Sequence, residues 1–217
     1  MEEKKLKFSD CTAAMMQDLF GLTQAWESPV LQQWLGLSQE QEIEAADRVS
    51  LEKLQATFVK MGDTWNDIEL IEYFVAPIFV IIDFNTPYFK IFSERRISAV
   101  VGDYELYGEP DACIAKGTYY PKTPFFCFNE YKRLEEARGD TLGQLLAAML
   151  AAQTGNPAPH PIYGVHVIDQ AWYFTALQGK TYTVSHSFAA DTEHLFDIFK
   201  LLKALKAILI EIAQQDA

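Results

Sequence analysis

Strand-forming and helix-forming segments alternate through the second half of the chain, and this order restricts the fold to a few classes. Strand composition marks Tyr88–Phe92, Ile97–Val101 and Tyr104–Ala115, and an apolar run predicts a further strand at Phe125–Lys132. An alanine-rich helix is expected next, capped by Asp140 or Thr141 and running to about Gln153. Its small side chains should let it pack closely on a sheet.

The remainder of the chain continues this pattern. Three short strands separated by turn residues form a predicted meander, and a long amphipathic helix follows them. The expected ranges are Ile162–Ile168, Ala171–Leu177, Thr181–Ser187 and, for the helix, Asp191–Gln214. The whole order predicts an α/β fold with a central mixed sheet flanked by helices.

The first third of the chain has helical periodicity. Helices are expected at Asp10–Ala25, just after Pro29 and at Ser38–Lys60, and Gly62-Asp63 interrupts the pattern. A further helix should begin at Thr64, with Asp67 completing a capping-box-like start, and end near Pro77. Asp67 lies near the centre of this helix's apolar face. It is either an acid of the first turn stabilised by the helix dipole or a side chain directed at a functional site.

Composition limits the class of protein. With 217 residues, of which 49% are hydrophobic, the chain is long enough for one main domain with an N-terminal elaboration. The charged start is not followed by an apolar signal core, and the apolar stretch Tyr73–Ile82 is far shorter than the roughly 20 residues that span a bilayer. Three widely spaced cysteines favour reduced thiols. We therefore expect a cytoplasmic protein without a membrane partner.

The net charge of −12 argues against strong nucleic-acid binding, because phosphates repel an acidic surface. Residues 90–138 differ from the rest, since they carry eight acidic and eight basic residues. These bases either form a local positive groove or are solvated charges scattered over strands and loops. We expect DNA binding by the chain alone to be weak. The bases are Lys90, Arg95, Arg96, Lys116, Lys122, Lys132, Arg133 and Arg138.

Two short motifs in this neutral segment suggest chemistry. Pro110-Asp111 precedes Glu130-Tyr131-Lys132, which ends the apolar strand. Because side chains alternate along a strand, Glu130 and Lys132 should share one face with Phe126 and Phe128. Converging carboxylates can bind Mg²⁺, and a nearby lysine can stabilise a developing negative charge. The motifs therefore predict a metal-dependent phosphodiesterase site.

Residues Trp65–Ser187 resemble the PD-(D/E)XK nuclease superfamily, whose core is a helix, three strands, a second helix and a further strand (αβββαβ). The motifs above match its signature, and Asn66–Pro77 is similar to the first helix in the nuclease domain of type I restriction enzyme motor subunits and their small stand-alone relatives. The resemblance implies a restriction-endonuclease-like core at residues 63–190. Residues 1–62 would be a helical extension, and residues 191–217 a helix that covers the core or pairs with a partner.

The resemblance also implies an activity and its residues. It predicts a metal-dependent DNA nuclease that binds Mg²⁺ or Mn²⁺ through Asp111, Glu130 and the carbonyl oxygen of Tyr131, with Asp67 as a further ligand. The family usually has glutamate at the position of Asp67. Lys132 would orient or help deprotonate the attacking water, and the products would carry a 5′-phosphate and a 3′-hydroxyl.

Three further residues are predicted to contact substrate. They are Gln144 on the alanine-rich helix, where some family members carry a glutamine, and Arg133 and Arg138 just before it. For Gln144 the alternative is a solvated side chain, because the helical wheel places it away from the apolar leucines.

Two other interpretations stay open. In the first, the charged residues form a structural ion cluster, in which Lys132 or Arg133 pairs with Asp111 or Glu130. In the second, the chain is a catalytically silent nuclease-fold subunit that binds DNA or assembles with proteins, as a homodimer or within a larger complex. The histidines lack metal-ligand spacing, and His166 is expected to be a packed side chain.

Overall fold

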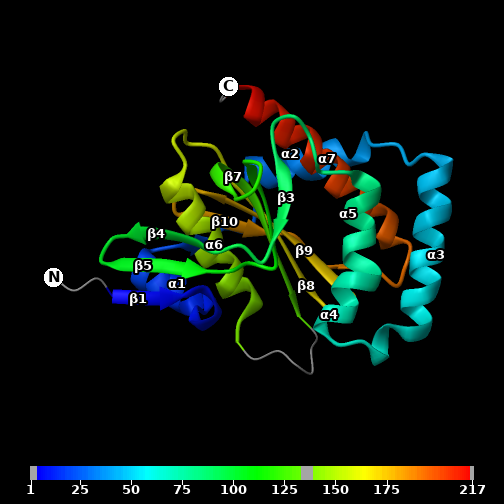
Figure 1. Ribbon diagram of the computed structural model, residues 1–217, viewed down its shortest axis with the longest axis horizontal. Helices are drawn as coiled ribbons and strands as arrows, with labels where there is room; N and C mark the ends of the chain where they lie inside the picture. Colours follow the sequence, from blue (N-terminus) through cyan, green and yellow to red (C-terminus); the bar gives the residue numbers. More distant parts are fainter. Residues whose placement is uncertain (1–3, 133–138, 216–217) are drawn as a thin grey trace.

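The computed structural model describes residues 4–132 and 139–215, and within them the chain forms an α/β fold around a mixed β-sheet (Figure 1). Eight described strands belong to this sheet, in the order β2-β10-β9-β8-β7-β6-β3, with β11 paired to β9. The predicted class, a central mixed sheet with helices on its faces, is confirmed. The strands are β2 (Thr23–Gln24), β3 (Lys90–Ser93), β6 (Ala112–Lys116), β7 (Lys122–Lys132), β8 (Ile162–Ile168), β9 (Ala171–Gln178), β10 (Thr181–Val184) and β11 (Phe188–Ala189).

The pairing of the central strands determines where their ends lie. β3, β6 and β7 pair antiparallel in that order, and β7 then pairs parallel with β8. Helix α6 (Thr141–Gly155) makes the crossover that a parallel pair requires. The carboxyl ends of β7 and β8 therefore meet at one edge, where Glu130 lies beside His166. The amino end of β6 lies at the same edge, because Ala112 is opposite Asn129.

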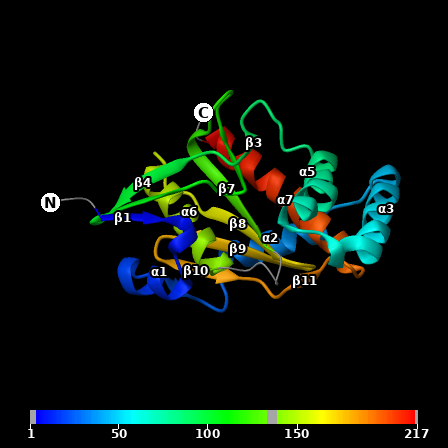
Figure 2. The same cartoon turned by 60° about the horizontal axis from the view of Figure 1, so that its bottom comes forward.

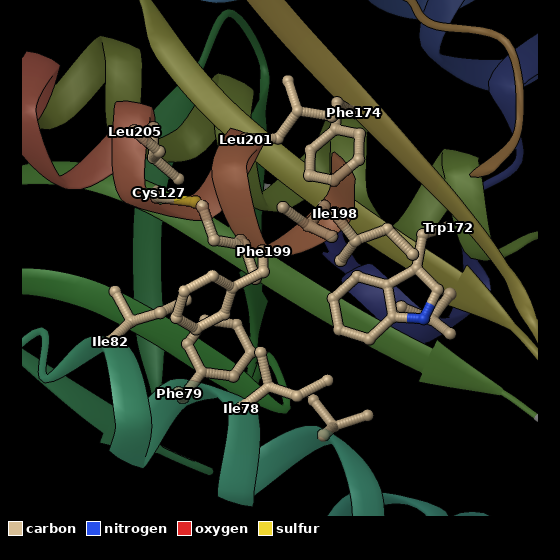
Figure 3. Packing of buried hydrophobic residues seen from close by; sticks show 14 of the residues in the cluster. Ile78, Phe79, Ile82, Cys127, Trp172, Phe174, Ile198, Phe199, Leu201 and Leu205 are labelled. Atoms are coloured by element: carbon tan, nitrogen blue, oxygen red, sulfur yellow. The ribbon is translucent and has the colours of Figure 1, made fainter. Parts of the chain in front are cut away.

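Helices cover both faces of this sheet (Figures 1 and 2). One face packs against α2, α3, α5 and α7, and Figure 3 shows part of this core, including Phe174, Phe199 and Leu201. The indole nitrogen of Trp34 on α2 donates a hydrogen bond of 2.8 Å to the Leu201 carbonyl oxygen on α7. The other face packs against α1 and α6. The helix ranges are α1 (Ala13–Phe20), α2 (Pro29–Gln39), α3 (Ala45–Met61), α5 (Ala76–Ile82) and α7 (His194–Gln215).

Helix α6 forms as the sequence predicts and is almost wholly buried. Asp140 caps it, since its Oδ1 accepts a hydrogen bond of 3.0 Å from the Gly143 amide. Its Oδ2 accepts another of 2.7 Å from the Ala13 amide at the start of α1. One carboxylate therefore joins two helix N-termini. The backbones approach so closely that a Cβ on Gly143 would lie 2.4 Å from Thr12 Cα.

The predicted helix end at Pro77 is wrong. Helical geometry continues from α4 (Asp67–Leu70) through the π-helical turn η3 (Ile71–Val75) into α5, where Pro77 occupies the first turn. A π turn shifts the hydrogen-bond register, so the missing proline N–H does not end the helix. The start also differs, because the capping box uses Asn66 and Glu69 rather than Thr64 and Asp67.

The predicted strand Tyr104–Ala115 is in fact two strands in two sheets. β5 (Tyr104–Gly108) pairs with β4 (Ile97–Val101) and with β1 (Lys4–Lys7) in a separate three-stranded sheet. The chain then bends and enters the main sheet as β6. The hairpin β4–β5 thus interrupts the antiparallel run β3-β6-β7.

The prediction that Phe126 shares a face with Phe128 is also wrong. Ile114 pairs with Cys127 and Ala115 with Phe125, so Phe126 is an extra residue in a β-bulge. Phe126 therefore packs in the core under α5 and α7, whereas Phe128 packs under α6. The register is regular from Cys127 to Lys132, and the predicted alternation holds there.

The amino-terminal segment contributes strands and helices to the fold, and the carboxyl-terminal helix packs on the main sheet. The segment predicted as helical at residues 9–60 contains shorter helices and also strand β2, while β1 precedes it. α7 buries its apolar side against the main core, so this helix covers the core, as one of the two sequence alternatives stated. Among the described residues, no helix is long and apolar enough to cross a membrane.

Candidate functional site

Asp111 lies in the bend between β5 and β6, directly before the first residue of β6. Its carboxylate Oδ2 accepts a hydrogen bond of 2.7 Å from the Tyr131 amide on β7. Its carbonyl oxygen accepts a second, of 3.2 Å, from the Glu94 amide just after β3. Asp111 is therefore held by both strands that flank β6.

Glu130 and Lys132 leave the same face of β7 at its carboxyl end. Glu130 is only 4% exposed, and Lys132 is half-buried. The Lys132 carbonyl oxygen accepts a hydrogen bond of 3.0 Å from the Asp169 amide, which holds the strand end. The structure thus brings Asp111, Glu130 and Lys132 together at the shared edge of β6 and β7.

The two carboxyl groups have perturbed acidities. Burial raises the pKa of Glu130 well above its usual range, the neighbouring Asp111 raises it further, and Lys132 partly opposes the shift. Burial also raises the pKa of Asp111, which the Tyr131 amide and Lys132 lower while Asp67 and Glu94 raise it. A shared positive charge would relieve this repulsion, so the site favours a cation or a proton.

Asp67 and Glu94 therefore lie close enough to act on Asp111 through their charge. Asp67 is half-buried in the first turn of α4, and it stays a predicted ligand of this site. Sequence reasoning did not select Glu94. This residue has a left-handed backbone conformation with φ of 48°, which is unusual for glutamate. The only sequence signal would have been an acid directly after a strand.

The donors fit a hard divalent cation in type but supply few carboxylates. Two acid side chains and the Tyr131 carbonyl offer the oxygen ligands that Mg²⁺ and Mn²⁺ prefer, with waters completing the shell. In residues 4–132 and 139–215, no group of three or more His, Cys, Asp or Glu side chains is arranged to hold a metal ion. A metal here would therefore depend on Asp111, Glu130 and backbone or water oxygens.

Gln144 is 6% exposed, so the alternative of a solvated glutamine is wrong. The amino-terminal part of α6 packs so closely on the sheet and on α1 that its polar residues Thr141 and Gln144 are buried. Gln144 lies in the first turn of α6, beside the cap residue Asp140 and on the helix that covers the Glu130 face of the sheet.

His166 is buried on the same face as Glu130, its partner in the parallel pair. Its ring stacks on Tyr173 with centroids 4.6 Å apart, which confirms a packed side chain. Burial lowers the pKa of His166 to about 4, although Asp140 opposes the shift, so the ring is neutral at pH 7. Its Nδ1 is buried without a hydrogen-bond partner in the described part of the chain. Only the β7–β8 register reveals this proximity.

The ion-cluster alternative required Lys132 or Arg133 to pair with Asp111 or Glu130. Among the described residues, Lys132 makes no ion pair with either acid. Arg133 and Arg138, predicted to contact substrate, lie outside the described residues.

No protein-family model matches this chain, and no curated protein sequence is significantly similar to it.

Proposed function

We propose that this protein is a metal-dependent nuclease that hydrolyses phosphodiester bonds in DNA. The observation that carries the proposal is the 2.7 Å hydrogen bond from the Tyr131 amide to Asp111, because it fixes an acid beside the Glu130 and Lys132 pair. Two acids can supply oxygen ligands to a metal ion, and a lysine beside them can stabilise the negative charge that develops during phosphodiester hydrolysis.

The connectivity of the central strands supports the proposal. The chain runs from helix α4–α5 to β3, β6 and β7, then through α6 to β8, and the last pair is parallel. This order resembles the αβββαβ core of PD-(D/E)XK nucleases, with the hairpin β4–β5 inserted before β6. On this proposal residues 63–190 are the nuclease-like core, flanked by an extension at residues 1–62 and a helix at residues 191–217.

Asp111, Glu130 and the Tyr131 carbonyl would hold Mg²⁺ or Mn²⁺, with Asp67 as a further candidate. When bound, the cation would neutralise the scissile phosphate and lower the pKa of a coordinated water. The Tyr131 amide keeps Asp111 oriented, so its carboxylate needs no rearrangement. Burial of Glu130 strengthens its interactions with charges at the site.

The half-buried Lys132 would orient the attacking water and stabilise negative charge that develops on it or on the phosphate. Gln144, whose helix covers the same face, would position Lys132 or the substrate. Arg133 and Arg138 would contact phosphates. Hydrolysis would leave a 5′-phosphate and a 3′-hydroxyl, as in the superfamily that the motifs resemble.

A second candidate is a catalytically silent subunit of the same fold that binds DNA or assembles with protein partners. The net charge of −12 and the lack of a third clustered carboxylate in the described residues favour it. The grouping of Asp111, Glu130 and Lys132 disfavours it, because buried acids with raised pKa values are costly to keep without a purpose.

Cleavage of supercoiled and single-stranded DNA by the purified chain separates the two candidates. Assays with Mg²⁺ or Mn²⁺ at low and moderate salt should show cleavage that Asp111→Asn and Lys132→Met abolish and EDTA prevents. Glu109→Gln is the matched control, because Glu109 is an exposed acid two residues before Asp111. No cleavage by a folded wild-type chain would favour the silent subunit.

A further inference from the structure

A hollow of about 820 Å³ lies at the end of β6 and β7 opposite to the candidate site. Its walls are the β6–β7 turn, which carries Tyr119 and Tyr120, and the segment before β3, which carries Tyr88. Asp111 directly precedes β6 and Lys116 ends it, so the two residues are about 16 Å apart at the usual rise of a strand. The hollow is therefore separate from Asp111 and Glu130.

The hollow is basic although the chain is acidic. Lys90, Lys116 and Lys122 line it, and none of its lining residues in the described part of the chain is an acid. Lys116 and Lys122 are direct partners in the antiparallel β6–β7 pair. Like charges placed opposite each other destabilise a sheet unless an anion compensates them. Within the described ranges, none of these lysines makes an ion pair with an acid.

Aromatic rings stand exposed beside these lysines. Tyr119 is 81% exposed and Tyr120 is 68% exposed, although tyrosines usually bury most of their rings. The turn that carries them is compact, because a Cβ on Gly117 would overlap the Tyr120 carbonyl oxygen. The opposite wall is held by hydrogen bonds, since the Thr86 hydroxyl accepts from the Tyr88 and Phe89 amides.

We infer that this hollow binds single-stranded nucleic acid, with bases stacked on Tyr119 and Tyr120 and phosphates on Lys90, Lys116 and Lys122. Exposed aromatic rings next to a positive groove are how proteins bind single strands without sequence readout. A duplex keeps its bases stacked inside and cannot use the rings. The volume also falls within the range of about 300–1,000 Å³ for ligand sites, which suits a few nucleotides at most.

The binding of a single strand in the hollow does not depend on the proposed nuclease function. Only the assignment of that strand as the nuclease substrate rests on it. From the hollow, the edge strand β3 leads from Lys90 towards exposed Arg95 and Arg96, next to the Glu94 amide that bonds to Asp111. A strand held in the hollow would therefore approach the candidate site along a basic edge. Binding itself needs neither the metal nor the acids.

The test is fluorescence anisotropy of the full chain with a labelled twelve-residue oligothymidylate, in EDTA and at several salt concentrations. Replacing both rings (Tyr119→Ala with Tyr120→Ala) should weaken binding by about 5- to 150-fold per ring, since stacking is worth about 1–3 kcal/mol per base. Lys116→Gln with Lys122→Gln should lower the salt-dependence slope by about 0.7 per lysine. Trp26→Ala and Lys60→Gln are the matched controls, because both residues are exposed and lie outside the hollow.

Binding within twofold of wild type in the double tyrosine variant, with an unchanged melting temperature, would overturn the inference. Equal affinity for a duplex, or for thymidine monophosphate alone, would also overturn it. The result is separable from the proposed function. Asp111→Asn should keep oligonucleotide binding while losing cleavage. If the wild-type chain binds the oligonucleotide but never cleaves DNA, the inference about the hollow would stand and the proposed nuclease function would be rejected.

Discussion

The Tyr131 amide on β7 donates a 2.7 Å hydrogen bond to the carboxylate of Asp111, which enters β6 from a neighbouring bend. This bond joins two motifs that are twenty residues apart in the sequence. It also holds Asp111 next to the buried Glu130, so two acids with raised pKa values share one strand edge.

Asp111→Ala should destabilise the protein by about 1–3 kcal/mol, because it leaves the buried Tyr131 amide without its acceptor. Relief of repulsion with Glu130 offsets part of this cost. Asp111→Asn keeps an acceptor oxygen and should lose less stability while losing all metal-dependent cleavage. Urea unfolding measures the difference, with Glu109→Ala as an exposed control expected within about 0.5 kcal/mol of wild type. Equal stability of Asp111→Ala and wild type would mean that the bond contributes nothing.

Stability should fall with rising pH through the titration of Glu130 and Asp111. Because both pKa values are raised on folding, the folded state binds these protons more tightly than the unfolded chain, whose carboxyls titrate near pH 4. The two groups therefore favour folding in acid and oppose it as pH rises from about 4 through their folded pKa values. Glu130→Gln should increase the free energy of unfolding at pH 8 relative to wild type, and this gain should vanish near pH 4. A gain that is independent of pH would contradict the assignment.

Divalent cations should stabilise the wild-type chain at this site. Binding to the folded state alone raises stability by RT ln(1 + [L]/Kd), and the ligands must be deprotonated. We expect Mg²⁺ or Mn²⁺ to raise the melting temperature more at pH 8 than at pH 5.5. The effect should disappear in Glu130→Gln and persist in Glu109→Gln. An equal rise in both variants would show that the ions act elsewhere.

The same substitution should have opposite effects at two helical glycines. Gly143→Ala on α6 would place a Cβ 2.4 Å from Thr12 Cα, so overpacking should cost about 1–3 kcal/mol. A Cβ at Gly36 on α2 meets no atom of the described residues within 4 Å, so Gly36→Ala should stabilise the protein by about 0.5–1 kcal/mol. Thermal melts of the two variants check the prediction. A stable Gly143→Ala variant would show that α1 and α6 can separate without loss.

The three thiols should resist modification until the protein unfolds. Cys11, Cys113 and Cys127 are free and almost wholly buried. Burial raises the pKa of Cys11 and of Cys113 to about 12, so neither forms the reactive thiolate at pH 8. A colourimetric thiol reagent should therefore react only in denaturant. The denaturant concentration at which half of the thiols react should equal the midpoint of the unfolding curve. Rapid reaction of one thiol in buffer would indicate local opening at that residue.

The sequence alone determined those features that depend on local periodicity. Helix α6 with its Asp140 cap, strand β8 and the long α7 lie close to where their patterns predict them. Glu130 and Lys132 share a face because side chains alternate along any regular strand. The sequence also selected Asp111 as their companion, through the proline–aspartate pair.

Tertiary structure decided the features that depend on contacts between distant segments. The split of residues 104–115 between two sheets needs β1 as a partner for β5, and the bulge at Phe126 needs the register with β6. Gln144 is buried because α6 lies between the sheet and α1. The helical wheel of α6 alone carries no information about these neighbours. The proximity of Glu94 to Asp111 and of His166 to Glu130 likewise follows from strand pairing. Periodicity is a property of one segment, whereas register and burial are properties of the neighbours that each segment meets.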